Sequence, residues 1–168
     1  MICKKIAVAT VAAIAAMSAI ADGIATVSGE ATGVWMESFA TATNFASRTS
    51  TPLVLFWANE GCPHCEALEA AVETADFKNW MASTPYAYCF VLARNKKDVG
   101  INADSGAKEF AQTAGGTIKK LTSFPFICLY WPKSDGSPVL KAYSGEMTAA
   151  QLKNRITTAF DGYTPMPD

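Results

Sequence analysis

The feature that most constrains the fold is an uninterrupted apolar run, PLVLFWA (52–58), which ends shortly before two cysteines. The run has no polar alternation, which is typical of a central strand covered on both faces. Cys62 and Cys65 follow it, with a proline and the single histidine of the chain between them. From Pro63 onward apolar residues recur at helical spacing, so the sequence predicts a buried strand followed by a helix that begins at the cysteines.

The other segments alternate between helical and strand-like patterns. Trp35, Phe39 and either Ala42 or Ala46 recur at helical spacing, which predicts a first amphipathic helix over 34–49. Further helices are expected from 63 to about 82 and over 107–116. A last helix is expected after a capping box of Thr148 and Gln151, and it would bury Leu152, Ile156 and Phe160. Further strands are expected over 87–93, 125–131 and 138–145, with a hairpin turn at 134–136. This order of elements is that of an α/β protein.

The first 21 residues have the layout of a secretory signal peptide. Two lysines precede an apolar stretch rich in small residues, and 19–21 offers the small residues that a signal peptidase reads. The alternative is a membrane anchor, which needs about 20 apolar residues, and this run is shorter. We therefore expect export to the periplasm or the medium, cleavage after Ala21, and no membrane association after cleavage.

The remaining residues suit a single domain. Half of the 168 residues are hydrophobic and the formal net charge is −1, which gives no electrostatic reason to expect nucleic acid as a partner. The expected organisation is a flexible lead-in over 22–33, one domain over 34–161 and a C-terminal tail over 162–168. Outside the cytoplasm disulfides persist, so the cysteines of the exported chain need not be metal ligands.

Two separated motifs give the chain a resemblance to the thioredoxin superfamily. Phe56-Trp57-Ala58 ends the strand before the C-x-x-C motif, and Ser123-Phe124-Pro125 precedes a later apolar strand. The resemblance covers roughly 34–161. It implies a thioredoxin fold, with a mixed sheet of four to five strands and helices on both faces, and a thiol–disulfide oxidoreductase without a cofactor. The Pro-His dipeptide is similar to that of the oxidising DsbA-like proteins, whereas the scaffold resembles smaller thioredoxin-like proteins and the C-terminal domain of DsbD, so the direction of electron flow stays open.

The resemblance makes Cys62 the attacking thiol and Cys65 the resolving thiol. A thiol attacks as the thiolate, and Cys62 would lie at the helix N-cap, where unpaired N–H groups and the helix dipole favour negative charge. Pro63 would occupy the first helical position, where its missing N–H costs nothing. His64 is expected to favour the thiolate, with a solvated bystander as the alternative.

The substrate groove is expected to be bordered by Phe124, Pro125 and Trp57, with a cis peptide bond between the first two, as the resemblance implies. One departure from thioredoxins concerns the strand before the cysteines. Leu55 stands where thioredoxins keep a buried acid, so proton transfer from Cys65 would use water or Glu60.

Two other interpretations of the cysteine pair compete with a redox centre. Half of a zinc site would need two further ligands, and a structural disulfide across so short a loop would constrain little of the unfolded chain. In the thioredoxin-like sheet that the resemblance implies, Cys89 and Cys128 lie on the two strands that flank 52–58, about 10 Å apart. That separation exceeds the roughly 7 Å that a disulfide spans, so both are expected to be buried thiols.

The leading functional hypothesis is therefore an exported thiol–disulfide oxidoreductase that is a monomer and binds no metal. Its partners would be protein thiols and disulfides, together with a redox partner that the sequence does not identify. The alternatives are a thioredoxin-fold binding or adaptor module with little turnover, and a metal chaperone.

Overall fold

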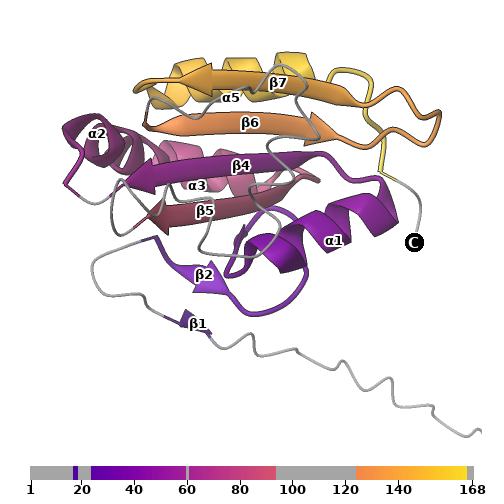
Figure 1. The fold of residues 1–168 in the computed structure, drawn as a ribbon, viewed down its shortest axis with the longest axis horizontal. Coiled ribbons are helices and arrows are strands. Elements are labelled where there is room, and N and C mark those ends of the chain that lie inside the picture. Colours follow the sequence, from indigo (N-terminus) through magenta and orange to yellow (C-terminus); the bar gives the residue numbers. More distant parts are fainter. Residues whose placement is uncertain (1–16, 19–23, 60, 94–123, 166–168) are drawn as a thin grey trace, which may run out of the picture.

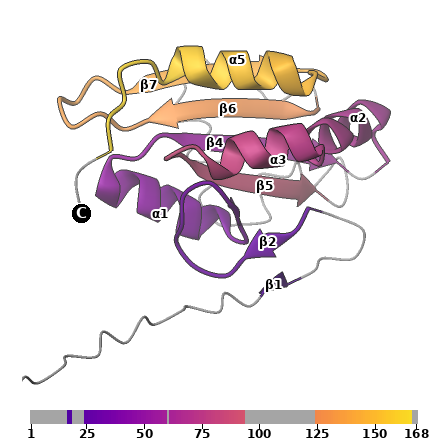
Figure 2. The same cartoon turned by 180° about the vertical axis from the view of Figure 1, so that it is seen from behind.

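The computed structural model describes residues 17–18, 24–59, 61–93 and 124–165. Within these ranges the chain forms a seven-stranded sheet with four helices. Helix α1 packs on one face of the sheet, and α2, α3 and α5 pack on the other. Figure 1 shows the sheet with α1 in front of it, and Figure 2 shows α3 and α5 in front of the strands when the molecule is seen from behind.

The elements have the following bounds. The strands are β1 (Met17–Ser18), β2 (Thr26–Val27), β3 (Trp35–Met36), β4 (Leu53–Asn59), β5 (Ala87–Ala93), β6 (Phe126–Trp131) and β7 (Val139–Ser144). The helices are α1 (Phe39–Thr49), α2 (Pro63–Val72), α3 (Ala75–Ala82) and α5 (Ala149–Ala159).

The strand order is β1-β2-β3-β5-β4-β6-β7, so β4 is central. Strand β4 pairs in parallel with β5 and antiparallel with β6, and β6 forms a hairpin with β7. The predicted α/β architecture is therefore confirmed: the sheet is mixed and carries helices on both faces. The sheet is larger than the four to five strands expected, because three two-residue strands extend it beyond β5.

The segment expected to be one helix over 34–49 contains a strand and a shorter helix. Trp35 pairs with Tyr88 of β5, and its ring lies 5.3 Å from that of Phe56 and 5.6 Å from that of Tyr88 between centroids. The α1 helix begins only at Phe39, because the hydroxyl of Ser38 accepts a hydrogen bond from the backbone of the first turn and caps it. The prediction that the helix reaches back to Trp35 was therefore wrong. The Trp35 ring packs against aromatic rings of the sheet, and the residue belongs to strand β3.

Part of the segment expected to be a flexible lead-in is packed. Ile24 is buried in the core, and Val27 of β2 pairs with Met36 of β3. Strand β1 lies inside the segment expected to be a signal peptide and pairs antiparallel with β2. Cleavage after Ala21 stays a prediction.

The helical prediction from 63 to about 82 corresponds to two consecutive helices. Helix α2 ends at Val72, and the hydroxyl of Thr74 accepts a hydrogen bond from Phe77 and begins α3. The predicted capping box of Thr148 and Gln151 is present at the start of α5. None of the described helices has the length and apolarity needed to cross a bilayer.

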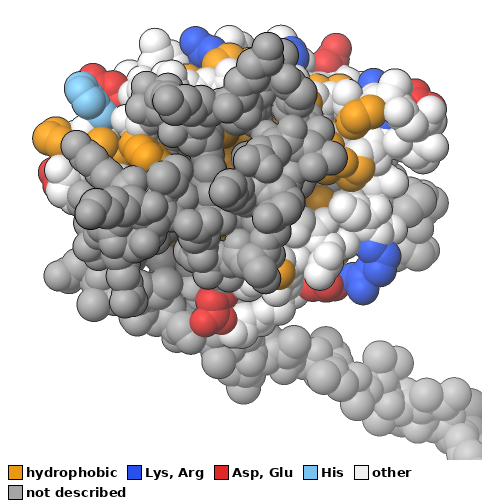
Figure 3. All heavy atoms as spheres, viewed as in Figure 1, with side chains coloured by type: hydrophobic (Ala, Val, Ile, Leu, Met, Phe, Trp, Pro, Cys, Tyr) orange, Lys and Arg blue, Asp and Glu red, His pale blue; other side chains and the backbone are white. Residues whose placement is uncertain are grey.

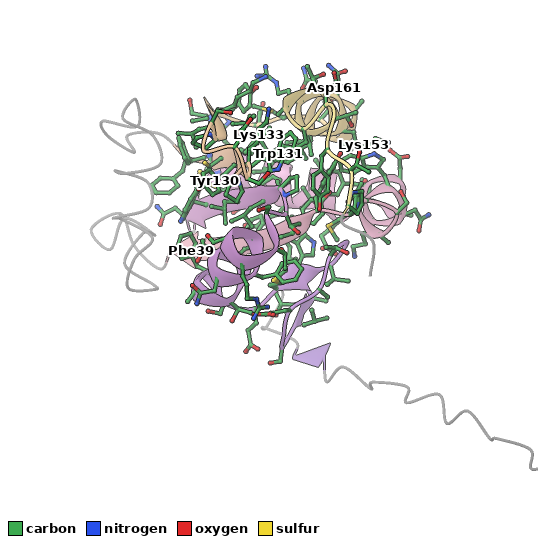
Figure 4. All side chains as sticks on the ribbon, turned by 90° about the vertical axis from the view of Figure 1, so that its right-hand side faces the viewer. Phe39, Tyr130, Trp131, Lys133, Lys153 and Asp161 are labelled. Atoms are coloured by element: carbon green, nitrogen blue, oxygen red, sulfur yellow. The ribbon has the colours of Figure 1, made fainter. Side chains whose placement is uncertain are left out.

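The far end of the sheet, away from the cysteines, is closed by aromatic packing. The Trp131 indole donates a hydrogen bond to the carbonyl oxygen of Ser50, and the Lys133 amino group lies 4.6 Å from the centre of the Trp131 ring (Figure 4). Tyr163 packs edge-on against the same indole. The helix expected over 107–116 and the loop before it lie outside the described residues.

Candidate active site

Cys62 is the N-cap residue of α2, as predicted. Its backbone is extended, with φ −102° and ψ 109°, and its carbonyl oxygen accepts hydrogen bonds from the N–H groups of Cys65 and Glu66 at 2.9 and 3.1 Å. Pro63 occupies the first turn of the helix, where a missing N–H leaves no partner unsatisfied. Cys62 itself is partly exposed.

Cys65 differs from Cys62 because the helix and β4 bury it completely. The backbone N–H of Asn59, at the end of β4, donates a hydrogen bond to the Cys65 sulfur at 3.4 Å. Burial, followed by a hydrogen bond with Cys62, raises the pKa of the Cys65 thiol to about 12. The two cysteines therefore combine an accessible thiol with a buried thiol that holds its proton.

The peptide bond between Phe124 and Pro125 is cis, as predicted. The Sγ atom of Cys62 lies 3.9 Å from the carbonyl oxygen of Phe124, and the carbonyl oxygen of Pro125 accepts a hydrogen bond of 2.9 Å from Gly145. Phe124 is half-buried and Pro125 is buried. The fold thus brings the proline motif and the C-x-x-C motif together.

The Trp57 side chain does not border an open groove. It is fully buried in the core that faces α1, where its ring centroid lies 6.1 Å from that of Phe39 and 5.6 Å from that of Phe126. The assignment of Trp57 to the substrate groove was therefore wrong. The side chains of β4 alternate between two buried faces, and the position of Trp57 points it toward α1.

His64 is exposed in the first turn of α2, and its Nδ1 atom lies 3.0 Å from Oε2 of Glu146. Figure 3 shows the histidine at the surface beside acidic side chains. Sequence reasoning did not identify Glu146. The two residues are 82 positions apart, and the only local signal is an acid directly after Gly145 at the end of the last strand.

Helix α2 carries two acidic residues, Glu66 and Glu69. Burial, and then the neighbouring charge of Glu66, raises the pKa of Glu69, and the charge of Glu69 in turn contributes to the raised pKa of Cys65. Leu55 is fully buried in β4, so that position supplies no acid to the pair. The side-chain oxygen of Asn59 is buried and has no hydrogen-bond partner within the described part of the chain.

Cys89 and Cys128 lie on the strands that flank β4, as predicted. Both pair in register with Leu55, one from β5 and one from β6, so they occupy one row across the sheet. Both are buried, and burial raises the pKa of Cys128 to about 12. Among the described residues, no group of three or more His, Cys, Asp or Glu side chains is arranged to hold a metal ion.

The sheet order, the cis proline and the cysteines at the start of α2 define a protein with the thioredoxin fold. A thioredoxin from Thermus thermophilus is similar in structure, with a TM-score of 0.53 and 11% identity over 73% of this chain and 84% of the other. The first thioredoxin domain of mouse protein disulfide-isomerase A4 gives a TM-score of 0.50 and 16% identity over 83% of this chain and 84% of the other. No protein-family model and no curated sequence matches the chain.

Proposed function

We propose that this chain is an exported thiol–disulfide oxidoreductase that exchanges disulfides with protein substrates through Cys62 and Cys65. The observation that carries the proposal is the contrast between the two thiols at the start of α2. Cys62 is partly exposed at the helix N-cap beside Phe124, whereas Cys65 is buried and its pKa is raised to about 12. An attacking thiol needs access and a site that favours negative charge, and a resolving thiol needs protection until the first step is complete.

The reaction that suits this geometry has two steps. The Cys62 thiolate attacks one sulfur of a substrate disulfide, so that the substrate S–S bond breaks, a mixed disulfide forms, and one substrate thiolate leaves. Cys65 then gives up its proton to solvent or to the leaving thiolate and attacks the Cys62 sulfur. The second substrate thiol is released, Cys62 and Cys65 become a disulfide, and two electrons have passed to the substrate. Oxidation of a substrate dithiol is the reverse.

The class of the structurally similar proteins agrees with the proposal. One is named a thioredoxin and the other a domain of a protein disulfide-isomerase. Protein thiols and disulfides are therefore the proposed substrates. The signal peptide predicted from the sequence supports a location outside the cytoplasm, where such substrates are oxidised.

Two assays test this function and its direction. The purified chain is assayed for reduction of insulin with dithiothreitol as electron donor, and for oxidation of a reduced unfolded protein in a glutathione buffer. The proposal is supported if the wild-type protein accelerates at least one of the two reactions and the Cys62→Ser variant does not. Wild-type protein that accelerates neither reaction would refute it.

One specific observation favours a binding module as a second candidate. The raised pKa of Cys65, with Leu55 in place of a buried acid, would slow the second step and prolong a mixed disulfide on Cys62. A module of this kind would capture a substrate covalently in the wild type as well as in Cys65→Ser, and would show no turnover.

A further inference from the structure

The contact between His64 and Glu146 joins the first turn of α2 to the connection between β7 and α5. His64 lies two residues after Cys62 in α2, and Glu146 lies between β7 and α5. Their side chains approach to 3.0 Å while each stays more than half exposed, at 66% and 57%.

The backbone fixes the position of Glu146. Its neighbour Gly145 donates a hydrogen bond of 2.9 Å to the carbonyl oxygen of Pro125, and its other neighbour, Met147, is buried. Phe124, bonded to Pro125, places its carbonyl oxygen 3.9 Å from the Cys62 sulfur. Contacts therefore connect Cys62 to Phe124, Pro125 to Gly145, and Glu146, the residue after Gly145, to His64.

The Glu146 carboxylate places a negative charge beside the His64 ring, at 3.0 Å from Nδ1. A negative charge bound to the imidazole opposes the attraction between that ring and a negative charge on Cys62.

We propose that Glu146 is a positioning residue for the redox pair: it holds the His64 imidazole toward the connection between β7 and α5 and offsets its charge. The Cys62–Cys65 disulfide is then less oxidising than it would be with His64 and without Glu146. This inference rests on the proposed function and adds a residue that regulates it.

The test compares wild type, Glu146→Gln, His64→Ala and the double variant, each as the full chain equilibrated with glutathione buffers. Free thiols are trapped by alkylation, and the peptide that carries Cys62 and Cys65 is quantified by mass spectrometry. We expect Glu146→Gln to shift the equilibrium constant toward the reduced pair by roughly two- to fivefold, the size typical of one exposed charge pair. The shift should fall to less than half of that when His64 is absent.

A matched control separates this mechanism from a general charge effect. Glu66→Gln removes the same charge from the first turn of α2, and no described hydrogen bond or ion pair joins Glu66 to His64. Its effect on the equilibrium constant should be the same with and without His64. An unchanged equilibrium in Glu146→Gln, or an equal shift in both histidine backgrounds, would overturn the inference.

A second readout keeps this test independent of turnover. The rate at which iodoacetamide alkylates Cys62 in the reduced protein follows the thiolate fraction, so it should rise in Glu146→Gln. If the wild type fails both catalytic assays, the proposed function fails, while the alkylation rates and the glutathione equilibrium still decide the role of Glu146. An unchanged alkylation rate would count against that role whatever the activity.

Discussion

The Sγ atom of Cys62 lies 3.9 Å from the carbonyl oxygen of Phe124, a residue 62 positions later in the chain. Under the proposed function, a peptide that pairs with the backbone next to Pro125 would bring its own sulfur to the start of α2 and close to Cys62. The proposed chemistry requires this proximity, and the predictions below test its consequences.

Replacement of each cysteine should separate the two steps of exchange. Cys62→Ser should abolish catalysis, because the buried Cys65 is inaccessible to substrates. Cys65→Ser should accumulate a mixed disulfide on Cys62, which non-reducing electrophoresis detects as a product that dithiothreitol removes. Faster alkylation of Cys65 than of Cys62 at neutral pH would contradict the assignment.

Removal of the histidine should make the disulfide a weaker oxidant. His64→Ala takes away a group that can donate a hydrogen bond or a positive charge beside Cys62, so the reduced form loses stabilisation. The reduction potential should fall, by about 30 mV for each 1.4 kcal/mol lost. If Glu146 offsets His64, the fall should be larger in the Glu146→Gln background than in the wild type. A potential that stays within a few millivolts in both backgrounds would make His64 a bystander.

Glu69 should slow the second step of exchange. Its charge contributes to the raised pKa of Cys65, so Glu69→Gln should lower that pKa and increase the population of the Cys65 thiolate. The measurement is the rate of glutathione release from a mixed disulfide preformed on Cys62, which should increase. Glu73→Gln is the control, because Glu73 lies one turn further along α2 and pairs with Lys78. Equal effects of the two substitutions would contradict a specific role for Glu69.

The buried thiol of Cys128 should make the protein less stable in alkali. Burial raises its pKa from 9.0 to about 12 in the folded protein, so between these values the unfolded chain loses the proton first. The stabilisation is complete below pH 9 and is lost as the pH rises toward 12, at up to about 1.4 kcal/mol per pH unit. Urea unfolding of the oxidised protein at several pH values should therefore show a smaller slope in Cys128→Ser. An identical slope would contradict a buried, titrating thiol.

Export should remove the first 21 residues. When the full-length chain is expressed with its own N-terminus in a bacterial host, we expect the mature protein in the periplasm or the medium, with Asp22 as its first residue. N-terminal sequencing identifies the cleavage site, and replacement of Ala21 by a bulky residue should block it. Uncleaved protein that stays in the cytoplasm would remove the basis for the proposed location.

Much of the fold could be predicted from local patterns. The apolar run that became β4, the run that became β5 and the capping box of α5 each depend on neighbouring residues, so periodicity and turn chemistry are sufficient to find them. The same holds for Cys62 and Pro63 at the start of α2, because helix caps are decided within one turn.

The contacts between distant segments could not be read in this way. Trp35 became a strand residue because it packs on Phe56 and Tyr88, and Trp57 became a core residue because it faces α1. Glu146 contacts His64 because β7 pairs with β6 and the chain that follows β7 passes beside the first turn of α2. Local patterns assign residues to helices and strands, but strand register and helix packing decide which side chains meet, and both depend on the free energy of the whole core.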